Sequence, residues 1–150
     1  MSYTIKRANS DDLDAVAHLF DGYRVFYEQA SDIDRARNFM EERLRLEDSV
    51  VFLVVEDDTG RALGFVQLYP LFSSVSTQRS WLLNDLFVAE AGRKQGVGEA
   101  LMQRAEDHAR ETGTIGLILN TAHTNTTAQR LYERMGYKLD TVFRTYRRFF

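Results

Sequence analysis

The chain has 150 residues, of which 44% are hydrophobic and 27% are charged, and its formal net charge is −3 at pH 7. This length suits one domain and is short for two. The negative charge argues against a general attraction to nucleic acid, and the absence of cysteine excludes disulfides, thiolate nucleophiles and cysteine-ligated metals. Because the N-terminal residues lack an apolar signal core and no apolar run could span a membrane, we expect a cytoplasmic protein that does not bind membranes.

The first half of the sequence alternates between helical and strand patterns. Asn9 or Ser10 precedes two aspartates and can cap a helix, whose positive end the aspartates suit. Pro70, the only proline, is expected to close a strand because it has no N–H for a sheet ladder. In chain order we predict a strand at 3–8, a helix from the cap to about residue 27, a helix at 32–46, a buried strand at 50–56, a turn at 57–60 and the hairpin partner at 62–70.

The second half predicts a β-α-β unit. Leu101, Ala105 and Ala109 mark the inward face of its helix, and Gly113 is placed to end that helix. In chain order we predict a polar loop at 73–77, a strand at 79–88, a glycine loop followed by a helix, a buried strand at 115–121, a helix at 125–135 stopped by Gly136, and a closing strand or hairpin at 137–150. The whole pattern favours one mixed α/β (α+β) domain over residues 1–150, with about four helices flanking a central sheet.

A strand followed by a glycine loop and a helix is the usual layout of a phosphate-binding site. A Walker loop would need lysine and a hydroxyl residue after its last glycine, but Glu99 and Ala100 follow Gly98, so a phosphate-transfer site is disfavoured. A dinucleotide-binding loop would need a third glycine where Leu101 stands, and it belongs earlier in the chain. The structural alternative is a glycine-rich helix start with a solvated basic pair.

The loop "RKQGVG", residues 93–98, resembles the Arg/Gln-x-x-Gly-x-Gly/Ala loop of the GNAT superfamily of N-acetyltransferases. Downstream, "LNTAHTNTTAQRLYERMGY" resembles the second signature of that family, a strand, an asparagine and a helix containing Leu-Tyr-Glu-x-x-Gly-Phe/Tyr. The resemblance covers nearly the whole chain. The positions that match this second signature are Asn125, Ala128, Leu131, Tyr132, Gly136 and Tyr137.

The resemblance implies acetyl-coenzyme A as co-substrate and no metal. The glycine loop would hold the pyrophosphate through backbone N–H groups, while two splayed parallel strands, 79–88 and 115–121, would leave main-chain groups free for the pantetheine amides. The N–H of Phe87 or Val88 would also polarise the thioester carbonyl. The implied cofactor-binding residues are Leu86, Phe87, Val88, Arg93, Lys94, Gln95, Gly96, Val97, Gly98, Glu99 and Asn125.

Tyr132 is the expected general acid. A phenol stays protonated at neutral pH and can protonate the departing thiolate. The structural alternative is an ordinary core tyrosine on the stripe Ala128, Leu131 and Met135. Asn125 equally suits a helix cap, and the two roles are compatible.

The acceptor site is expected at the end of the first helix and on the strand at 79–88. Aromatic rings and a carboxylate suit a cationic amine. Spermidine/spermine-type enzymes of the family have a glutamate-aspartate pair where Asn84-Asp85 stands, and asparagine cannot act as a base. Asp85 points to the opposite side of a regular strand, so the base stays open, with His123 and Glu28 as further candidates. The expected substrate-binding residues are Tyr23, Tyr27, Glu28, Asn84 and Asp85.

The resulting hypothesis is an acetyl-CoA-dependent N-acetyltransferase that acts by direct attack in a ternary complex. Its acceptor is a primary amine, either a small polyamine-like molecule or a lysine side chain. The alternative is a non-catalytic acyl-CoA-binding or regulatory module with the same fold. The C-terminal "RTYRRFF" suits a solvated strand face or an inter-subunit strand contact, and the resemblance implies a homodimer.

Overall fold

The computed structural model describes residues 2–150, which form two compact units. The first unit ends at Asn120 and contains a five-stranded mixed sheet whose spatial order follows the chain order. The second unit, Thr121–Phe150, contains α4 (Thr126–Arg134). The elements of the first unit are β1 (Tyr3–Arg7), α1 (Leu13–Phe26), α2 (Ile33–Leu46), β2 (Val50–Glu56), β3 (Ala62–Ser73), β4 (Gln78–Val88), α3 (Val97–Glu111) and β5 (Leu117–Leu119), with short 3-10 turns at Ser10–Asp12 and Glu90–Gly92.

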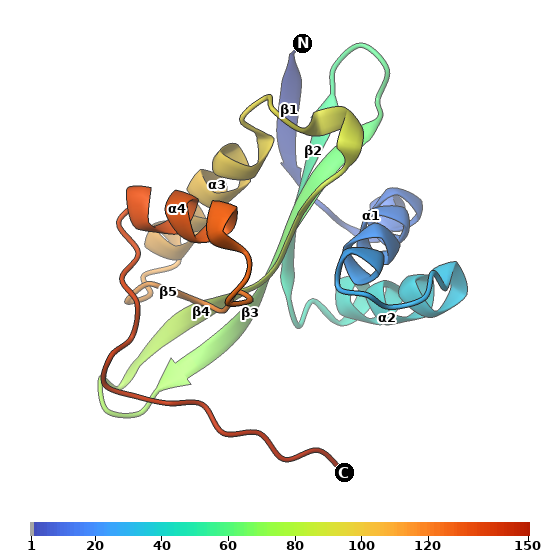
Figure 1. The fold of residues 1–150 in the computed structure, drawn as a ribbon. Coiled ribbons are helices and arrows are strands. Elements are labelled where there is room, and N and C mark those ends of the chain that lie inside the picture. Colours follow the sequence, from blue (N-terminus) through green and yellow to red (C-terminus); the bar gives the residue numbers. More distant parts are fainter. Residues whose placement is uncertain (1) are drawn as a thin grey trace. The chain divides into compact units, whose positions relative to one another are not determined.

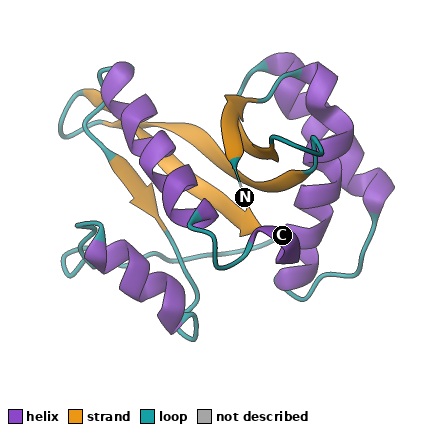
Figure 2. Cartoon of the chain, turned by 90° about the horizontal axis from the view of Figure 1, so that it is seen from above, coloured by secondary structure: helices purple, strands orange, loops and turns teal. Residues whose placement is uncertain are grey.

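Within the first unit, α1 and α2 cover one face of the sheet and α3 covers the other (Figure 1). Figure 2 shows α1 and α2 together on one side of the strands of this unit. The predicted inward residues of α3, Leu101, Ala105 and Ala109, are all buried. On the opposite face, Val16 of α1 and Met40 of α2 pack into one apolar cluster with β2 and β3. The predicted β-α-β unit is confirmed, because β4 and β5 are parallel and α3 connects them.

The helix ends follow the capping residues that the sequence offers. Asn9 caps the 3-10 turn Ser10–Asp12 that leads into α1, because its side chain accepts a hydrogen bond from the N–H of Asp11 and its own N–H donates to Asp12 Oδ2, both at 2.9 Å. Asp32 caps α2 by accepting from the Arg35 N–H at 3.1 Å. Gly113 follows the end of α3 in the left-handed region, with φ 67°, where glycine has no steric penalty.

A β-bulge interrupts β4 at Asn84. In the β3–β4 ladder, Gln67 lies opposite Asp85 and Leu68 lies opposite Leu83, which leaves Asn84 without a cross-strand partner. One extra residue reverses the alternation of side chains along a strand. Leu83 therefore faces α3, whereas Asp85, only two residues further on, faces α1 and α2.

Main-chain hydrogen bonds show the same reversal. Trp81 and Ala89 are separated by an even number of residues, so their N–H groups would point to the same edge of a regular strand. Instead, Trp81 donates to Gly116 O on the β5 side at 3.0 Å, and Ala89 donates to Leu63 O on the β3 side at 2.8 Å. The bulge thus changes which N–H groups of β4 point toward β5.

The predicted splay of the two parallel strands is present in the pairing. β5 pairs with β4 only at Trp81–Leu83, and its three residues are fewer than the seven predicted at 115–121. β4 runs on to Val88 and remains paired with β3 over that stretch. Residues 85–88 therefore have a strand partner only on the β3 side among the residues that the sheet contains.

Two strand predictions are wrong. Pro70 does not close β3, which continues to Ser73 with Pro70 opposite Trp81. The β2 pairing ends at Leu68, so Pro70 lies at a sheet edge, where a missing N–H is tolerated. The predicted C-terminal strand or hairpin is also absent, since residues 137–150 form no helix or strand. Alternation of apolar residues allows a strand, but a strand also needs a paired neighbour, and this segment has no sheet partner.

Gly64 gives a test of the β3–β4–α3 packing. A Cβ at this position would lie 2.8 Å from the Phe87 carbonyl oxygen and 3.2 Å from Val97 Cγ1. We expect Gly64→Ala to lower the free energy of unfolding by about 2 kcal/mol, because backbone cannot move aside as a flexible side chain does. Urea unfolding measures this change. Gly98→Ala is the control, since its Cβ would meet only Val88 Cγ2 at 3.7 Å, and equal stability of the two variants would contradict the packing.

Candidate active site

The glycine loop leads from β4 into the N-terminus of α3. Lys94 and Gly96 both adopt left-handed backbone angles, with φ 61° and 75°. Gln95 Nε2 donates to Ala91 O at 2.9 Å and braces the turn. The N–H of Ala100 makes the first helical bond, to Gly96 O, so the N–H groups of Val97 and Gly98 have no carbonyl within the helix to bond. Together with the dipole of a 15-residue helix, these groups are suited to bind an anion.

The loop has the charge and the space that a diphosphate requires. Arg93 and Lys94 are exposed. Arg93 Nε donates to Val88 O at 3.3 Å, which leaves the other guanidinium N–H groups for an anion. At Gly98 an added Cβ would find no atom closer than 3.7 Å, so the backbone surface there is open to a ligand. The residues present therefore fit the pyrophosphate of coenzyme A.

The bulge decides which main-chain donors of β4 face the edge that β5 leaves unpaired. Since Ala89 donates toward β3, the N–H of Phe87 points the same way, and the N–H groups of Leu86 and Val88 point to the opposite edge. Of the two candidate donors to a thioester carbonyl, Val88 is the one directed to this edge. An extended ligand with amide groups can pair there as an added strand.

The bulge also brings three predicted site residues together. The Tyr23 hydroxyl of α1 donates to the Asn84 main-chain oxygen at 3.2 Å. Asn84 Nδ2 donates to Asp85 Oδ1 at 2.6 Å, which directs the Asn84 side-chain oxygen away from Asp85. Asn84 is exposed and Asp85 is only 1% exposed, so these neighbours present different groups to a ligand.

Asp85 belongs to a buried polar chain that sequence reasoning missed. Gln67 Nε2 donates to Asp85 Oδ2, and Ser49 Oγ donates to Gln67 Oε1 at 2.8 Å. Burial raises the pKa of the Asp85 carboxyl, and hydrogen bonds from Asn84, Gln67 and Tyr23 partly oppose that rise. Burial, followed by the charge of Asp85, likewise raises the pKa of the Tyr23 phenol. The detectable signal was Gln67, a polar residue inside the apolar strand "ALGFVQLY".

Tyr27 and Glu28 lie exposed at the C-terminus of α1. The Tyr27 ring packs 5.0 Å from the Tyr23 ring, centroid to centroid, and so borders the Tyr23–Asn84 contact. Glu28 has φ 63°, an uncommon angle for a residue with a side chain. Aromatic rings and a carboxylate at this helix end form an environment that suits a cation.

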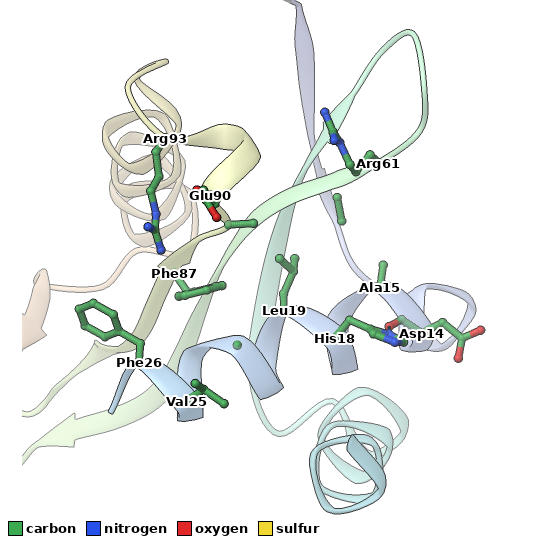
Figure 3. Close-up of a pocket in the computed structure, with 13 residues that line it drawn as sticks. Asp14, Ala15, His18, Leu19, Val25, Phe26, Arg61, Phe87, Glu90 and Arg93 are labelled. Atoms are coloured by element: carbon green, nitrogen blue, oxygen red, sulfur yellow. Dashed lines mark hydrogen bonds between the residues drawn. The ribbon is translucent and has the colours of Figure 1, made fainter. Parts of the chain in front are cut away.

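A pocket of about 710 Å³ opens between α1 and the end of β4. Figure 3 shows Phe26 and Phe87 at its apolar part, with Arg93 reaching toward them from the glycine loop. Glu90 and Arg61 are also at its border. None of the predicted acceptor residues lines this pocket, whereas Phe87 and Arg93 of the predicted cofactor set do.

Comparison with known proteins identifies the fold and the family. The model of the acetyltransferase (GNAT) family matches residues 13–137, most of the chain. The chain belongs to the GNAT family of acetyltransferases. It is 45% identical over 139 residues to the uncharacterized N-acetyltransferase YhfO of Bacillus subtilis, covering 93% of this chain and 92% of that protein. It is 32% identical over 134 residues to a probable acetyltransferase of Haemophilus influenzae, covering 89% of each.

A solved structure agrees with this assignment to the GNAT family. The crystal structure of a probable acetyltransferase matches with a TM-score of 0.92 and 42% identity, over 98% of this chain and 97% of that one. The protein is therefore an acyltransferase with a GNAT domain, and GNAT acetyltransferases use acetyl-CoA. Across residues 2–150 no helix has the length and apolar character to cross a membrane. The same residues contain no group of three or more histidine, aspartate or glutamate side chains placed to hold a metal.

The asparagine and the helix of the second GNAT signature lie in the second unit. Asn125 caps α4 there, with its side chain accepting from the Ala128 N–H at 3.3 Å. Tyr132 lies on α4 and packs edge-on against Tyr137 at 6.2 Å between ring centroids. Tyr132 is half-buried, and α4 has no fully buried residue.

The loop assignment predicts a specific loss of ligand binding. Gly98→Glu places a carboxylate where the diphosphate would lie, so we expect its affinity for coenzyme A to fall about 100-fold, by steric exclusion and charge repulsion. Calorimetric titration measures the affinity, and thermal unfolding should show a melting temperature close to that of the wild type. Gly98→Ala is the matched control. Gly96 is less suitable because any side chain at its φ of 75° is strained. Unchanged affinity in Gly98→Glu would contradict this placement.

Proposed function

We propose that the protein is an acetyl-CoA-dependent N-acetyltransferase that moves an acetyl group to a primary amine by direct attack in a ternary complex. The observation that carries the proposal is the unpaired edge of β4 at residues 84–88, which leads into the anion-binding N-terminus of α3. A single ligand with a diphosphate at one end and an extended amide-containing arm fits these two features together. Acetyl-CoA has that form, and it supplies the thioester.

The cofactor contacts follow from this arrangement. Loop N–H groups and the cations of Arg93 and Lys94 would bind the pyrophosphate. The main chain of Leu86–Val88 would pair with the pantetheine amides, with the Val88 N–H directed at the thioester carbonyl. Loss of one such donor typically costs about 3 kcal/mol of transition-state stabilisation. Asn125 would contact the cofactor in addition to capping α4.

The acceptor we propose is a cationic primary amine, either a small polyamine-like molecule or a lysine side chain. Exposed Tyr27 and Glu28 supply aromatic surface and negative charge, and Asn84, whose main-chain oxygen accepts from Tyr23, presents an exposed side-chain oxygen. Asn84 can accept a hydrogen bond from the amine but cannot remove its proton. Its role is therefore to orient the nucleophile.

Tyr132 is proposed as the general acid that protonates the thiolate of coenzyme A. A phenol with an ordinary pKa near 10 keeps its proton at neutral pH and can give it to a departing sulfur.

We further propose a single catalytic domain over residues 1–150, a cytoplasmic location and a homodimer. Six large apolar side chains of the C-terminal segment are 78% exposed or more, and three arginines lie among them. This composition suits contact with a second copy, because the arginines are cationic and the chain as a whole has a formal net charge of −3. These six residues are Leu139, Val142, Phe143, Tyr146, Phe149 and Phe150.

Release of free thiol from acetyl-CoA tests the proposed function. Wild-type protein is assayed with a panel of diamines, polyamines and lysine-containing peptides. We expect at least one amine to raise thiol release, and Tyr132→Phe to lower kcat about 100-fold because the leaving thiolate loses its proton donor. Tyr137→Phe is the matched control, since it removes the hydroxyl of the ring that packs against Tyr132.

Coenzyme A binding without thiol release for any amine would overturn the catalytic proposal and favour an acyl-CoA-binding module. Equal rates for Tyr132→Phe and wild type would remove Tyr132 from the acid role alone.

A further inference from the structure

A tyrosine hydroxyl from β1 lies next to the glycine loop. A Cβ added at Gly96 would lie 4.0 Å from the Tyr3 hydroxyl. Apart from the residues beside Gly96 in the chain, no other atom of residues 2–150 comes within 4 Å of that position. Figure 1 shows the N-terminal end of β1 beside the loop that enters α3. The first strand and the glycine loop, far apart in the sequence, therefore border one open space.

The Tyr3 hydroxyl is held in place and has no partner of its own. It forms no hydrogen bond with any of residues 2–150, and the side chain is half-buried. The backbone of Tyr3 is fixed by the β1–β2 ladder, in which it lies opposite Glu56. A phenol can donate one hydrogen bond and accept others. A fixed donor beside a loop suited to anions is itself suited to an anionic oxygen.

The place of β1 in the sheet decides which part of a ligand Tyr3 can reach. Two strands, β2 and β3, separate β1 from β4. Under the proposed function, the thioester arm of acetyl-CoA leaves the loop along the β4 edge that β5 leaves unpaired, which faces away from β1. The Tyr3 hydroxyl therefore lies on the side of the loop where the nucleotide end of the ligand would be.

We propose that Tyr3 binds the 3′-phosphate on the ribose of coenzyme A, by donating a hydrogen bond from its hydroxyl to a phosphate oxygen. The ribose carries the diphosphate and this further phosphate on the same sugar ring. A diphosphate held by the loop therefore keeps the 3′-phosphate close to Gly96. Hydrogen bonds to a charged acceptor are stronger than those between neutral groups. This inference rests on the proposed function and adds a residue that distinguishes coenzyme A from the same ligand without its 3′-phosphate.

The charges around Tyr3 are compatible with a further phosphate. The carboxylate of Glu56, its neighbour across the ladder, is paired with Arg61 Nη2 at 3.2 Å. Lys94 precedes Gly96 by two residues, is exposed and forms no ion pair within residues 2–150. The negative charge next to Tyr3 is therefore compensated, and the loop carries an unpaired positive charge.

Dephospho-coenzyme A, which has a hydroxyl in place of the 3′-phosphate, tests this assignment. Calorimetric titration measures the affinity of wild type and of Tyr3→Phe for coenzyme A and for dephospho-coenzyme A. We expect Tyr3→Phe to bind coenzyme A about tenfold more weakly, because a hydrogen bond to a charged group is lost. The same variant should bind dephospho-coenzyme A within about twofold of wild type, since that ligand lacks the acceptor.

Tyr69→Phe is the matched control. Tyr69 is also half-buried, but it lies two residues after Gln67 in β3 and so on the same face of the strand. Gln67 contacts Met40 of α2, so this face is the one opposite α3. Removal of the Tyr69 hydroxyl should therefore leave the affinity for both ligands unchanged.

An equal loss for both ligands in Tyr3→Phe would overturn the assignment, because the hydroxyl would then support the loop and not the 3′-phosphate. Unchanged affinity of Tyr3→Phe for coenzyme A would also overturn it. Failure of wild type to bind either ligand would instead contradict the cofactor site of the proposed function. Binding of dephospho-coenzyme A by Tyr3→Phe shows in the same experiment that the variant is folded and its loop intact.

Discussion

The single unpaired residue in β4 is the constraint on which the site depends. Without the bulge at Asn84, Asp85 would face α3 and the Leu86 and Val88 N–H groups would point toward β3. The extra residue turns the acid toward α1 and the two donors toward the unpaired edge. One insertion thus sets the positions of the acceptor side and the thioester side of the proposed reaction. The two sides stay in register because both belong to the same strand.

The buried polar network behind the bulge is stable because each of its side chains is hydrogen-bonded. Ser49, Gln67 and Asp85 are all buried, and each has a hydrogen-bond partner within the chain. A half-satisfied network of this kind would cost more than an apolar core. Gln67 also makes a weak contact with Met40 Sδ at 3.8 Å, which ties the network to α2. Within residues 2–150 the scaffold therefore holds the Asp85 carboxylate in the interior without an ion pair.

Most of the fold could be predicted from local patterns. The β2 bounds and the α2 start follow from an apolar run and from Asp32, because burial and capping are local effects. The wrong predictions involve tertiary pairing. Pro70 can stay inside β3 because the pairing of β3 with β2 has already ended at Leu68. Residues 137–150 have a pattern that would allow a strand, but no strand of the sheet pairs with them. Neither fact is encoded in the residues concerned.

In the candidate site, too, local features could be predicted from the sequence and tertiary contacts could not. The turn from β4 into α3 could be predicted, because the residue types that a phosphate-binding loop requires lie together in the sequence. The contact between Tyr23 and Asn84 could not, since the two residues are far apart in the chain and a bulge has no distinct sequence pattern. Asp85 seemed misplaced for a role beside Asn84 under regular alternation, and the bulge changes that geometry.

The left-handed backbone angles of Glu28 and Lys94 affect how this enzyme can be made more stable by evolution. Both hold left-handed backbone angles that favour glycine, one at the acceptor side and one in the anion loop. Selection for thermal robustness alone would favour glycine at both positions, because relief of such strain is worth about 1 kcal/mol. Each replacement would remove a charge to which we assign a role in ligand binding under the proposed function. Directed evolution of a hardier variant therefore needs a screen for turnover, or it will drift toward a stable protein that no longer recognises its ligands.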